Sequence, residues 1–303
     1  VDHEKINPGR VAIATACSYP KYGEDRLQTI RGDLALHNLQ EALELGYNVV
    51  GIDGGSSEPF RSLAASKGIQ LIPEMQIGMS PSRRQAFQEA FRIVLDKGVV
   101  VWQEPEKRLA KKKKEQYPDC MELIAEPILL GYADLVVPTR NRRLFELSYP
   151  RYQVISETNG NNKFNALLRA TKPPLLASDK PDLDVFFGPK AFRATPEMLA
   201  LFLQVYDFDS SNLFGVQKLA KPENYFDATM LPVVDALREN LRVLSVEVPF
   251  VYPEKQKEIE DDPAVRDQML RKRKTQLFGI VDELAHYLAY RNLIKGKSKI
   301  KPL

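Results

Sequence analysis

The stretch that decides the fold is Gly98-Val-Val-Val-Trp-Gln-Glu-Pro-Glu-Lys107, an apolar run that ends in two carboxylates separated by one residue. Its β-branched and aromatic residues, 99 to 102, predict a strand that is buried on both faces, as in a parallel sheet. Glu104 and Glu106 then lie at the carboxyl end of this strand, the edge where open α/β sheets bind ligands. Two carboxylates beside a rigid proline suit a divalent metal ion that carries a phosphate. Taken alone, the tripeptide is more often an exposed turn with two solvated glutamates.

On both sides of this stretch, apolar strands alternate with segments of helical periodicity. Strands are expected at 10–16, 47–53, 69–72, 99–102 and 133–138, and helices at 27–45, 60–66, 81–96 and 121–130. Strand and helix in regular alternation imply right-handed crossovers between parallel strands. The sequence therefore predicts an α/β fold with a mostly parallel central sheet flanked by helices.

The second half of the chain is less regular. A mostly helical segment is expected at 149–170, a strand with a turn at 184–190, a helix from 195, a helix at 227–237 kinked by Pro232, a strand at 241–251 and a long charged helix at 262–294. We therefore expect residues 1–255 to form one domain. Residues 256–303 are expected to form a helical, basic C-terminal extension.

The composition is that of an ordinary globular protein. The 303 residues are 44% hydrophobic, and 43 basic against 40 acidic residues leave a net charge of +3, which argues against a dedicated nucleic-acid binder. Cys17 and Cys120 lie far apart, so neither a disulfide framework nor a zinc site is indicated, and a reducing cytosol is expected. No apolar run reaches the roughly 20 residues of a spanning helix. We expect a cytoplasmic protein, with the basic tail 295–301 as a candidate for peripheral contact with acidic lipid.

Two further polar signals follow neighbouring strands. Asp53-Gly-Gly-Ser-Ser57 comes directly after the second expected strand. Ser80-Pro81 is a typical helix start, and it places Arg83 and Arg84 in the first turn. Basic residues there oppose the helix dipole, which is easier to understand if an anion binds at that helix start, although a tolerated surface charge explains them equally well.

Three signals follow one another along the chain: a strand ending in Ile-Asp-Gly-Gly-Ser-Ser, a basic helix start, and a strand that ends in two spaced acids. In this order of signals, the sequence resembles glycosyltransferases of the GT-A fold that use nucleotide-diphospho-sugars. The resemblance is to the family 2 group, and the chain is also similar to glucosyl-phosphoglycerate and mannosylglycerate synthases. It covers about residues 10 to 255. It implies a hexosyltransferase that moves a sugar from a UDP- or GDP-sugar to a hydroxyl acceptor with the help of a divalent metal.

The resemblance also implies roles for individual residues. Asp53 takes the place of the acid that contacts the nucleotide base, and the loop after the first strand packs against base and ribose. Glu104 and Glu106 occupy the place of the family's Asp-x-Asp, which holds Mn²⁺ or Mg²⁺ on the diphosphate, and the longer side chains depart from that pattern. The nucleotide-binding residues implied in this way are Ala16, Cys17, Ser18, Tyr19, Asp53, Gly54, Gly78, Arg83, Arg84 and Gln103.

On the acceptor side, the resemblance points to two carboxylates. Asp184 begins a segment similar to the family's acceptor-side strand, and Asp227 matches the acid of the helix beneath the acceptor. An inverting enzyme needs such a carboxylate as a general base. The histidine that often completes the metal shell of retaining relatives is absent from residues 246–252. The stereochemical outcome stays open.

Three other interpretations compete. A non-catalytic member of the fold could bind nucleotide alone, given glutamates in place of aspartates. A sugar-phosphate nucleotidyltransferase normally has a glycine-rich loop with a basic residue after the first strand, and Ala16-Cys-Ser-Tyr-Pro20 lacks it. The basic run Lys111 to Lys114 has no interleaved aromatic residues, so no nucleic-acid partner is expected. The expected partners are a nucleotide-sugar donor and a small-molecule, glycan or lipid-linked acceptor, and the C-terminal helix is a candidate surface for homo-oligomer formation.

Overall fold

The computed structural model describes residues 6–111, 119–206 and 227–291. Within these residues, one seven-stranded sheet has the order β3-β2-β1-β4-β6-β5-β7. Strand β6 is antiparallel to its neighbours β4 and β5, and the other pairs are parallel. The strands are β1 (Val11–Cys17), β2 (Asn48–Asp53), β3 (Leu71–Pro73), β4 (Val99–Trp102), β5 (Leu135–Arg140), β6 (Lys190–Arg193) and β7 (Val243–Val248). The predicted α/β fold with a mostly parallel sheet flanked by helices is confirmed.

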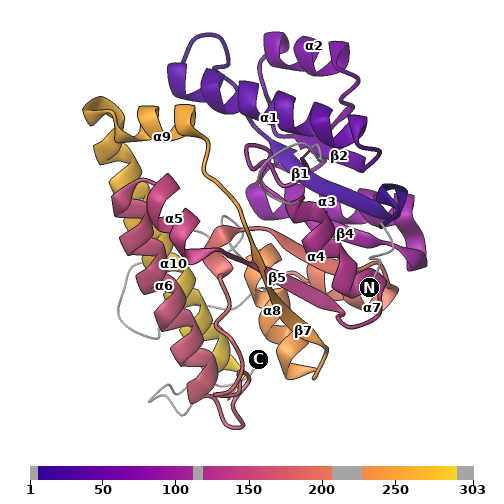
Figure 1. Cartoon of the computed structure of the whole chain (residues 1–303), viewed down its shortest axis with the longest axis vertical. Coiled ribbons are helices and arrows are strands. Elements are labelled where there is room, and N and C mark those ends of the chain that lie inside the picture. The colour runs from indigo at the N-terminus through magenta and orange to yellow at the C-terminus, as the bar shows by residue number, and fades with distance from the viewer. Residues whose placement is uncertain (1–5, 112–118, 207–226, 292–303) are drawn as a thin grey trace.

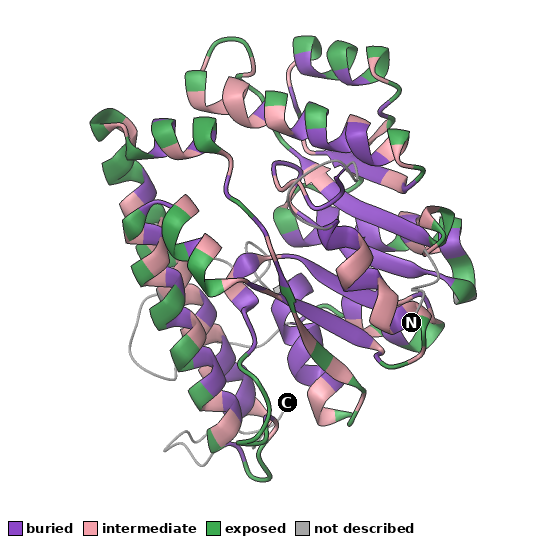
Figure 2. Ribbon diagram, in the orientation of Figure 1, coloured by how far each residue is buried: buried purple, intermediate pink, exposed green. Residues whose placement is uncertain are grey.

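Strand β4 lies in the middle of the sheet and is buried along its whole length (Figure 2). Its residues alternate between two apolar clusters, because successive side chains of a strand point to opposite faces. Val100 and Trp102 pack with Phe87 of α3 (Met79–Val94). Val99 and Val101 pack with residues of α4 (Cys120–Leu129) on the other face. Apolar side chains on both faces explain why the strand reads as a continuous hydrophobic run.

The remaining helices surround this sheet (Figure 1). They are α1 (Arg26–Glu44), α2 (Glu58–Ser66), α5 (Arg142–Ser148), α6 (Arg151–Ala170), α7 (Pro196–Leu203), α8 (Asp227–Arg238), α9 (Glu254–Asp261) and α10 (Pro263–Tyr290). Among the described residues, none of the helices has the length and apolar character needed to cross a bilayer.

The C-terminal helices lie against the rest of the chain. Helix α10 runs along α6, and α9 contacts α1 (Figure 1). Ile280, Leu284 and Leu288 of α10 belong to the same apolar cluster as Val100 of β4. The predicted boundary near residue 255 stays a prediction, but the described part of the extension shares the core of the preceding residues.

The structure corrects three local predictions. Helix α3 begins at Met79 and not at Pro81, because Gly78 adopts φ +136°, a conformation that favours glycine, and places Ser80 inside the first turn. The segment 184–190 is not a strand, since a 3₁₀ turn, Val185–Phe187, leads into Gly188 at φ +100° and β6 begins only at Lys190. Helices α5 and α9 were not expected, because charged residues hid their short apolar faces.

Candidate functional site

Two adjoining cavities open at the carboxyl ends of β1 to β4, the edge that the sequence predicted to bind a ligand. The large cavity has a volume of about 510 Å³, and the small cavity about 190 Å³. Six residues line both cavities: Arg31, Met79, Arg83, Glu104, Glu106 and Lys272. Because they share this wall, a ligand in the large cavity can reach into the small one.

The large cavity brings together most of the residues that the resemblance implied for nucleotide binding. The lining residues from that set are Ala16, Cys17, Ser18, Tyr19, Gly54, Gly78 and Arg83, and both metal candidates, Glu104 and Glu106, line it as well. The loop after β1 is held against the loop after β2. Ser18 Oγ donates to the Gly54 carbonyl at 3.0 Å, and the Tyr19 amide donates to Ser56 Oγ at 3.0 Å.

Three predicted nucleotide-binding residues do not line the cavities. Asp53 is buried, its Oδ1 accepts from the Ser56 amide at 3.0 Å, and its Oδ2 lies 3.7 Å from Arg61 Nη1. Gln103 is buried, and its backbone carbonyl accepts from the Thr15 hydroxyl at 2.9 Å. Arg84 is half-buried on α3. Their roles in nucleotide binding stay predictions.

The turn that carries Glu104 and Glu106 is fixed by α1. Asn38 Nδ2 of this helix donates to the Pro105 carbonyl at 3.1 Å, and Arg31 Nη2 lies 2.7 Å from Glu106 Oε1. Lys107 Nζ lies 3.1 Å from Glu104 Oε2. Burial raises the pKa of Glu104, but Lys107 and Arg83 outweigh this, so the net pKa is lowered and the carboxylate is ionised at neutral pH.

The donor chemistry of this turn fits a divalent cation. Two carboxylates face the cavities, and carboxylate oxygens are ligands that Mn²⁺ and Mg²⁺ accept. Within the described ranges, no three His, Cys, Asp or Glu side chains are grouped closely enough to hold a metal ion. The assignment of Glu104 and Glu106 as metal ligands stays a prediction.

Cations dominate the small cavity. Its charged lining residues are six basic and three acidic ones: Arg31, Arg83, Lys107, Arg140, Lys272, Arg273, Glu104, Glu106 and Glu157. The Arg83 guanidinium is buried and lies 5.1 Å from the centre of the Trp102 ring. Arg31, desolvation and Arg273 lower the pKa of Lys272 to about 8. Such a concentration of positive charge attracts anionic ligands.

Five of these basic residues were missed by the sequence analysis. Arg31 lies in α1, Lys107 follows the acidic turn, Arg140 ends β5, and Lys272 and Arg273 come from α10. The residues Arg271-Lys-Arg-Lys274 form a basic run in the sequence, but nothing in the sequence shows that α10 reaches the edge of the sheet. A helix that returns to a site from more than 150 residues away leaves no local signal.

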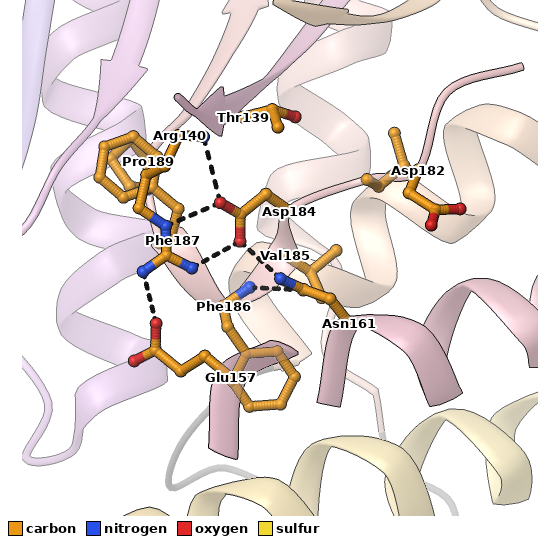
Figure 3. Close-up of polar contacts among 12 residues, drawn as sticks. Thr139, Arg140, Glu157, Asn161, Asp182, Asp184, Val185, Phe186, Phe187 and Pro189 are labelled. Carbon is orange, nitrogen blue, oxygen red and sulfur yellow. Dashed lines mark hydrogen bonds and ion pairs between the residues drawn. The ribbon is translucent and has the colours of Figure 1, made fainter. Parts of the chain in front are cut away.

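Arg140, at the end of β5, joins two acids into a buried network (Figure 3). Its Nε and Nη2 donate to Asp184 Oδ2 and Oδ1, each at 2.7 Å, and Nη1 donates to Glu157 Oε2 at 2.5 Å. Asn161 Nδ2 also donates to Asp184 Oδ1 at 2.7 Å. Burial raises the pKa of Asp184, but Arg140 and these hydrogen bonds outweigh it and lower the pKa below its ordinary value.

The two predicted catalytic carboxylates are thus placed differently. Asp184 is buried, does not line the cavities, and uses both oxygens within the network. Asp227 is the first residue of α8, and its side chain lies outside the described part of the structure. Its neighbours Thr229 and Met230 line the small cavity. Both catalytic assignments stay predictions.

The loop between Asp184 and β6 supports Glu104. Lys190 is fully buried, and its Nζ donates to the carbonyls of Gly188 and Pro189, each at 3.1 Å. A Cβ at Gly188 would come within 2.2 Å of Glu104 Oε1, so only glycine allows this backbone to approach the carboxylate. Lys107 Nζ also donates to the Phe187 carbonyl. The loop therefore approaches Glu104 closely and also holds Lys107, the ion-pair partner of Glu104.

Comparison with solved structures finds nucleotide-sugar transferases. The fold is similar to that of glucosyl-3-phosphoglycerate synthase from Mycobacterium tuberculosis, with 15% identity, coverage of 95% of this chain and 82% of that chain, and a TM-score of 0.49. Mannosyl-3-phosphoglycerate synthase from Rubrobacter xylanophilus is 12% identical, the match covers 95% of this chain and 77% of that chain, and the TM-score is 0.49. The Mycobacterium enzyme solved with Mn²⁺, UDP and glucosyl-3-phosphoglycerate is 14% identical, the match covers 89% of this chain and 79% of that chain, and the TM-score is 0.47.

These are enzymes of the kind to which the sequence analysis compared the chain. No family model and no curated protein matches the sequence. At 12 to 15% identity, the likeness concerns the fold and assigns no role to any residue of this chain.

Proposed function

We propose that this protein is a glycosyltransferase that moves a sugar from a UDP- or GDP-sugar to a hydroxyl acceptor. The observation that carries the proposal is the cavity at the carboxyl edge of the sheet, where a glycine-containing turn, basic side chains and two carboxylates meet. A nucleotide diphosphate needs this combination, since its base requires a wall of loops and its phosphates require cations.

The diphosphate lies where the two cavities join. Arg31, Arg83 and Lys272 line both of them and offset the negative charge that develops on the leaving diphosphate. Arg83 is already held against Trp102, and Arg31 against Glu106, so little reorganisation is needed when the donor binds. Preorganised charge of this kind is usually a large part of a rate enhancement.

Glu104 and Glu106 hold a divalent cation in this proposal. The cation supplies further neutralisation of the diphosphate charge when it is bound. The carboxylate of Glu104 is kept ionised by Lys107 and Arg83, and the loop around Gly188 keeps it in place. Glu106 is fixed by Arg31.

The acceptor occupies the small cavity and carries an acidic group. The small cavity has more basic than acidic residues, among them Arg140 and Arg273, and this excess supports an anionic acceptor. The Mycobacterium synthase has been solved with phosphoglyceric acid. Asp184 acts on the acceptor through Arg140, whose guanidinium it orients, and Asp227 at the start of α8 is the candidate general base.

The experiment that tests this function measures the release of nucleotide from UDP- and GDP-sugars with Mn²⁺, with and without 3-phosphoglycerate. We expect release to depend on the acceptor and to fall about 100-fold in Glu106→Gln, because the variant loses a metal ligand and the partner of Arg31. The control is Glu58→Gln, an acid of α2 whose side chain is 72% exposed. Nucleotide binding without any release would instead identify a non-catalytic nucleotide-binding protein.

A further inference from the structure

We propose that Glu74, and not Asp53, is the carboxylate that recognises the nucleobase of the donor, and that it selects a base with an imino N–H, uracil or guanine. The proposal rests on the proposed function, because it concerns the same cavity. It gives the large cavity a specificity-determining residue that neither the sequence pattern nor the resemblance indicated.

Glu74 follows β3 directly and lines the large cavity. Its backbone amide donates to the Asp53 carbonyl at 3.0 Å, which continues the pairing of β3 with β2 beyond the end of the strand. Its side chain points across the start of α3, where Oε2 accepts from the Ser82 hydroxyl at 2.7 Å. The residue is half-buried, so its carboxylate is held by the protein and still reaches the cavity.

The backbone around this carboxylate is shaped to leave room for it. A Cβ at Gly54 would lie 3.3 Å from Glu74 Oε2 and 3.5 Å from the Cys17 carbonyl oxygen, so the missing side chain of Gly54 opens the cavity floor between β1 and β3. On the other side, Gly78 lets α3 begin early enough for Ser82 to reach Glu74. Cys17, Gly54, Gly78 and Ser82 all line the same cavity as Glu74.

Asp53 has a different task. One of its oxygens accepts from the Ser56 amide at 3.0 Å and the other lies 3.7 Å from Arg61 Nη1. Arg61 Nη1 also donates to the Ser56 carbonyl. The side chain therefore closes the turn after β2 and holds α2 beside it, and it does not line the cavity. Of the two acids at this edge, Glu74 is the one that a bound ligand meets.

A carboxylate in this position discriminates between bases by its hydrogen-bonding character. An ionised carboxylate only accepts hydrogen bonds. Uracil N3 and guanine N1 carry a hydrogen and can donate to it, whereas cytosine N3 and adenine N1 are themselves acceptors and would face it lone pair to lone pair. Sites built on a specific hydrogen bond reject ligands that cannot make it, because a buried polar group is then left without its partner.

The test is calorimetric titration of the full chain with UDP, GDP, CDP and ADP, for the wild type, Glu74→Gln and Asp53→Asn. We expect the wild type to bind UDP or GDP at least about tenfold more tightly than CDP and ADP. Glu74→Gln should narrow this preference about tenfold, since its amide can donate to cytosine N3 and still accept from Ser82. Asp53→Asn should keep the preference, and melting curves confirm that both variants fold.

An unchanged base preference in Glu74→Gln, or a preference lost in Asp53→Asn, would overturn the assignment. Titration with 2′-deoxy-UDP separates the base from the ribose. If removal of the 2′-hydroxyl weakens wild-type binding about tenfold but has no effect in Glu74→Gln, Glu74 contacts the ribose and the proposed base contact is wrong. If the wild type binds none of the four nucleotides, the proposed function itself fails.

Discussion

Two groups of charged residues lie at the same edge of the sheet and use their charges differently. In the Arg140 network (Arg140, Glu157 and Asp184), every side chain is buried, and the arginine meets both acids at 2.5 to 2.7 Å. In the cavity cluster (Arg31, Arg83 and Lys272), the basic side chains line open space that the large and small cavities share.

The difference separates an arginine whose charge is balanced by two buried acids from a cluster in which Lys272 lies among other cations. Burial alone would lower the pKa of Arg140, but Asp184 and Glu157 raise it well above its ordinary value. The pKa of Lys272 is lowered, chiefly because the neighbouring Arg31 repels its charge. Repulsion between neighbouring cations destabilises the empty site, so the binding of an anion there is electrostatically favourable.

The largest effect is expected from breaking the Arg140 network. Arg140→Met leaves Asp184 and Glu157 buried without their arginine, so we expect the free energy of unfolding to fall by about 3 to 5 kcal/mol. Denaturant unfolding measures this change. The matched variant in the cavity cluster is Lys272→Met, which should not lower the free energy of unfolding, because Arg31 and Arg273 repel the Lys272 ammonium in the folded chain. If both variants lost the same free energy of unfolding, the proposed difference between the Arg140 network and the cavity cluster would be wrong.

A second effect separates two adjacent arginines of α3. Arg83 lines both cavities and Arg84 lines neither, although both are in the first part of the helix. We expect Arg83→Met to slow nucleotide release from the donor about 100-fold, since it removes a cation facing the diphosphate. Arg84→Met should change the rate less than about threefold. Steady-state kinetics on both variants show whether nucleotide release depends on the arginine that lines the cavity or on any basic residue at the start of the helix.

The smallest effect concerns Lys190, a buried cation that, unlike Arg140, has only carbonyl partners in its hydrogen bonds. Burial lowers its pKa from 10.5 to about 7. Above pH 7 the folded chain releases this proton while the unfolded chain keeps it, so the residue makes the free energy of unfolding rise with pH. Relative to Lys190→Met, the wild type should gain up to about 1.4 kcal/mol per pH unit between pH 7 and 9. Parallel curves for the two proteins would contradict this prediction, because they would mean that folded Lys190 keeps its proton up to pH 9 as it does in the unfolded chain.

Much of the fold could be predicted from sequence, because its determinants are local. The run Val99 to Trp102 and its flanking helical periodicities specify a buried strand and its crossovers, and the structure places it at the centre of the sheet. The antiparallel β6 was not predicted. Its four residues follow a turn at Gly188, and the long-range contacts of this segment are the pairing of β6 with β4 and the hydrogen bonds of Asp184 with Arg140.

The sequence predicted those parts of the site that follow directly after strands. Residues 16–19, Gly54, Gly78, Arg83 and Glu104 follow strands in the sequence, and they line one cavity in the structure. Arg31, Lys272 and Arg273 come from the middle of helices, where a basic residue looks like any solvated one. Glu74 was overlooked because Asp53 carries the more familiar motif, and only the packing around Gly54 shows which of the two acids faces the cavity.

The central claim is that the cavity cluster binds a nucleotide diphosphate, and the change in melting temperature with UDP, GDP, CDP and ADP, each with and without Mn²⁺, tests it most directly. The account predicts that UDP or GDP raises the melting temperature of the wild type, that Mn²⁺ enlarges the shift, and that Arg83→Met loses most of it while Arg84→Met keeps it. A wild-type protein that no nucleotide stabilises, with or without Mn²⁺, would contradict the account.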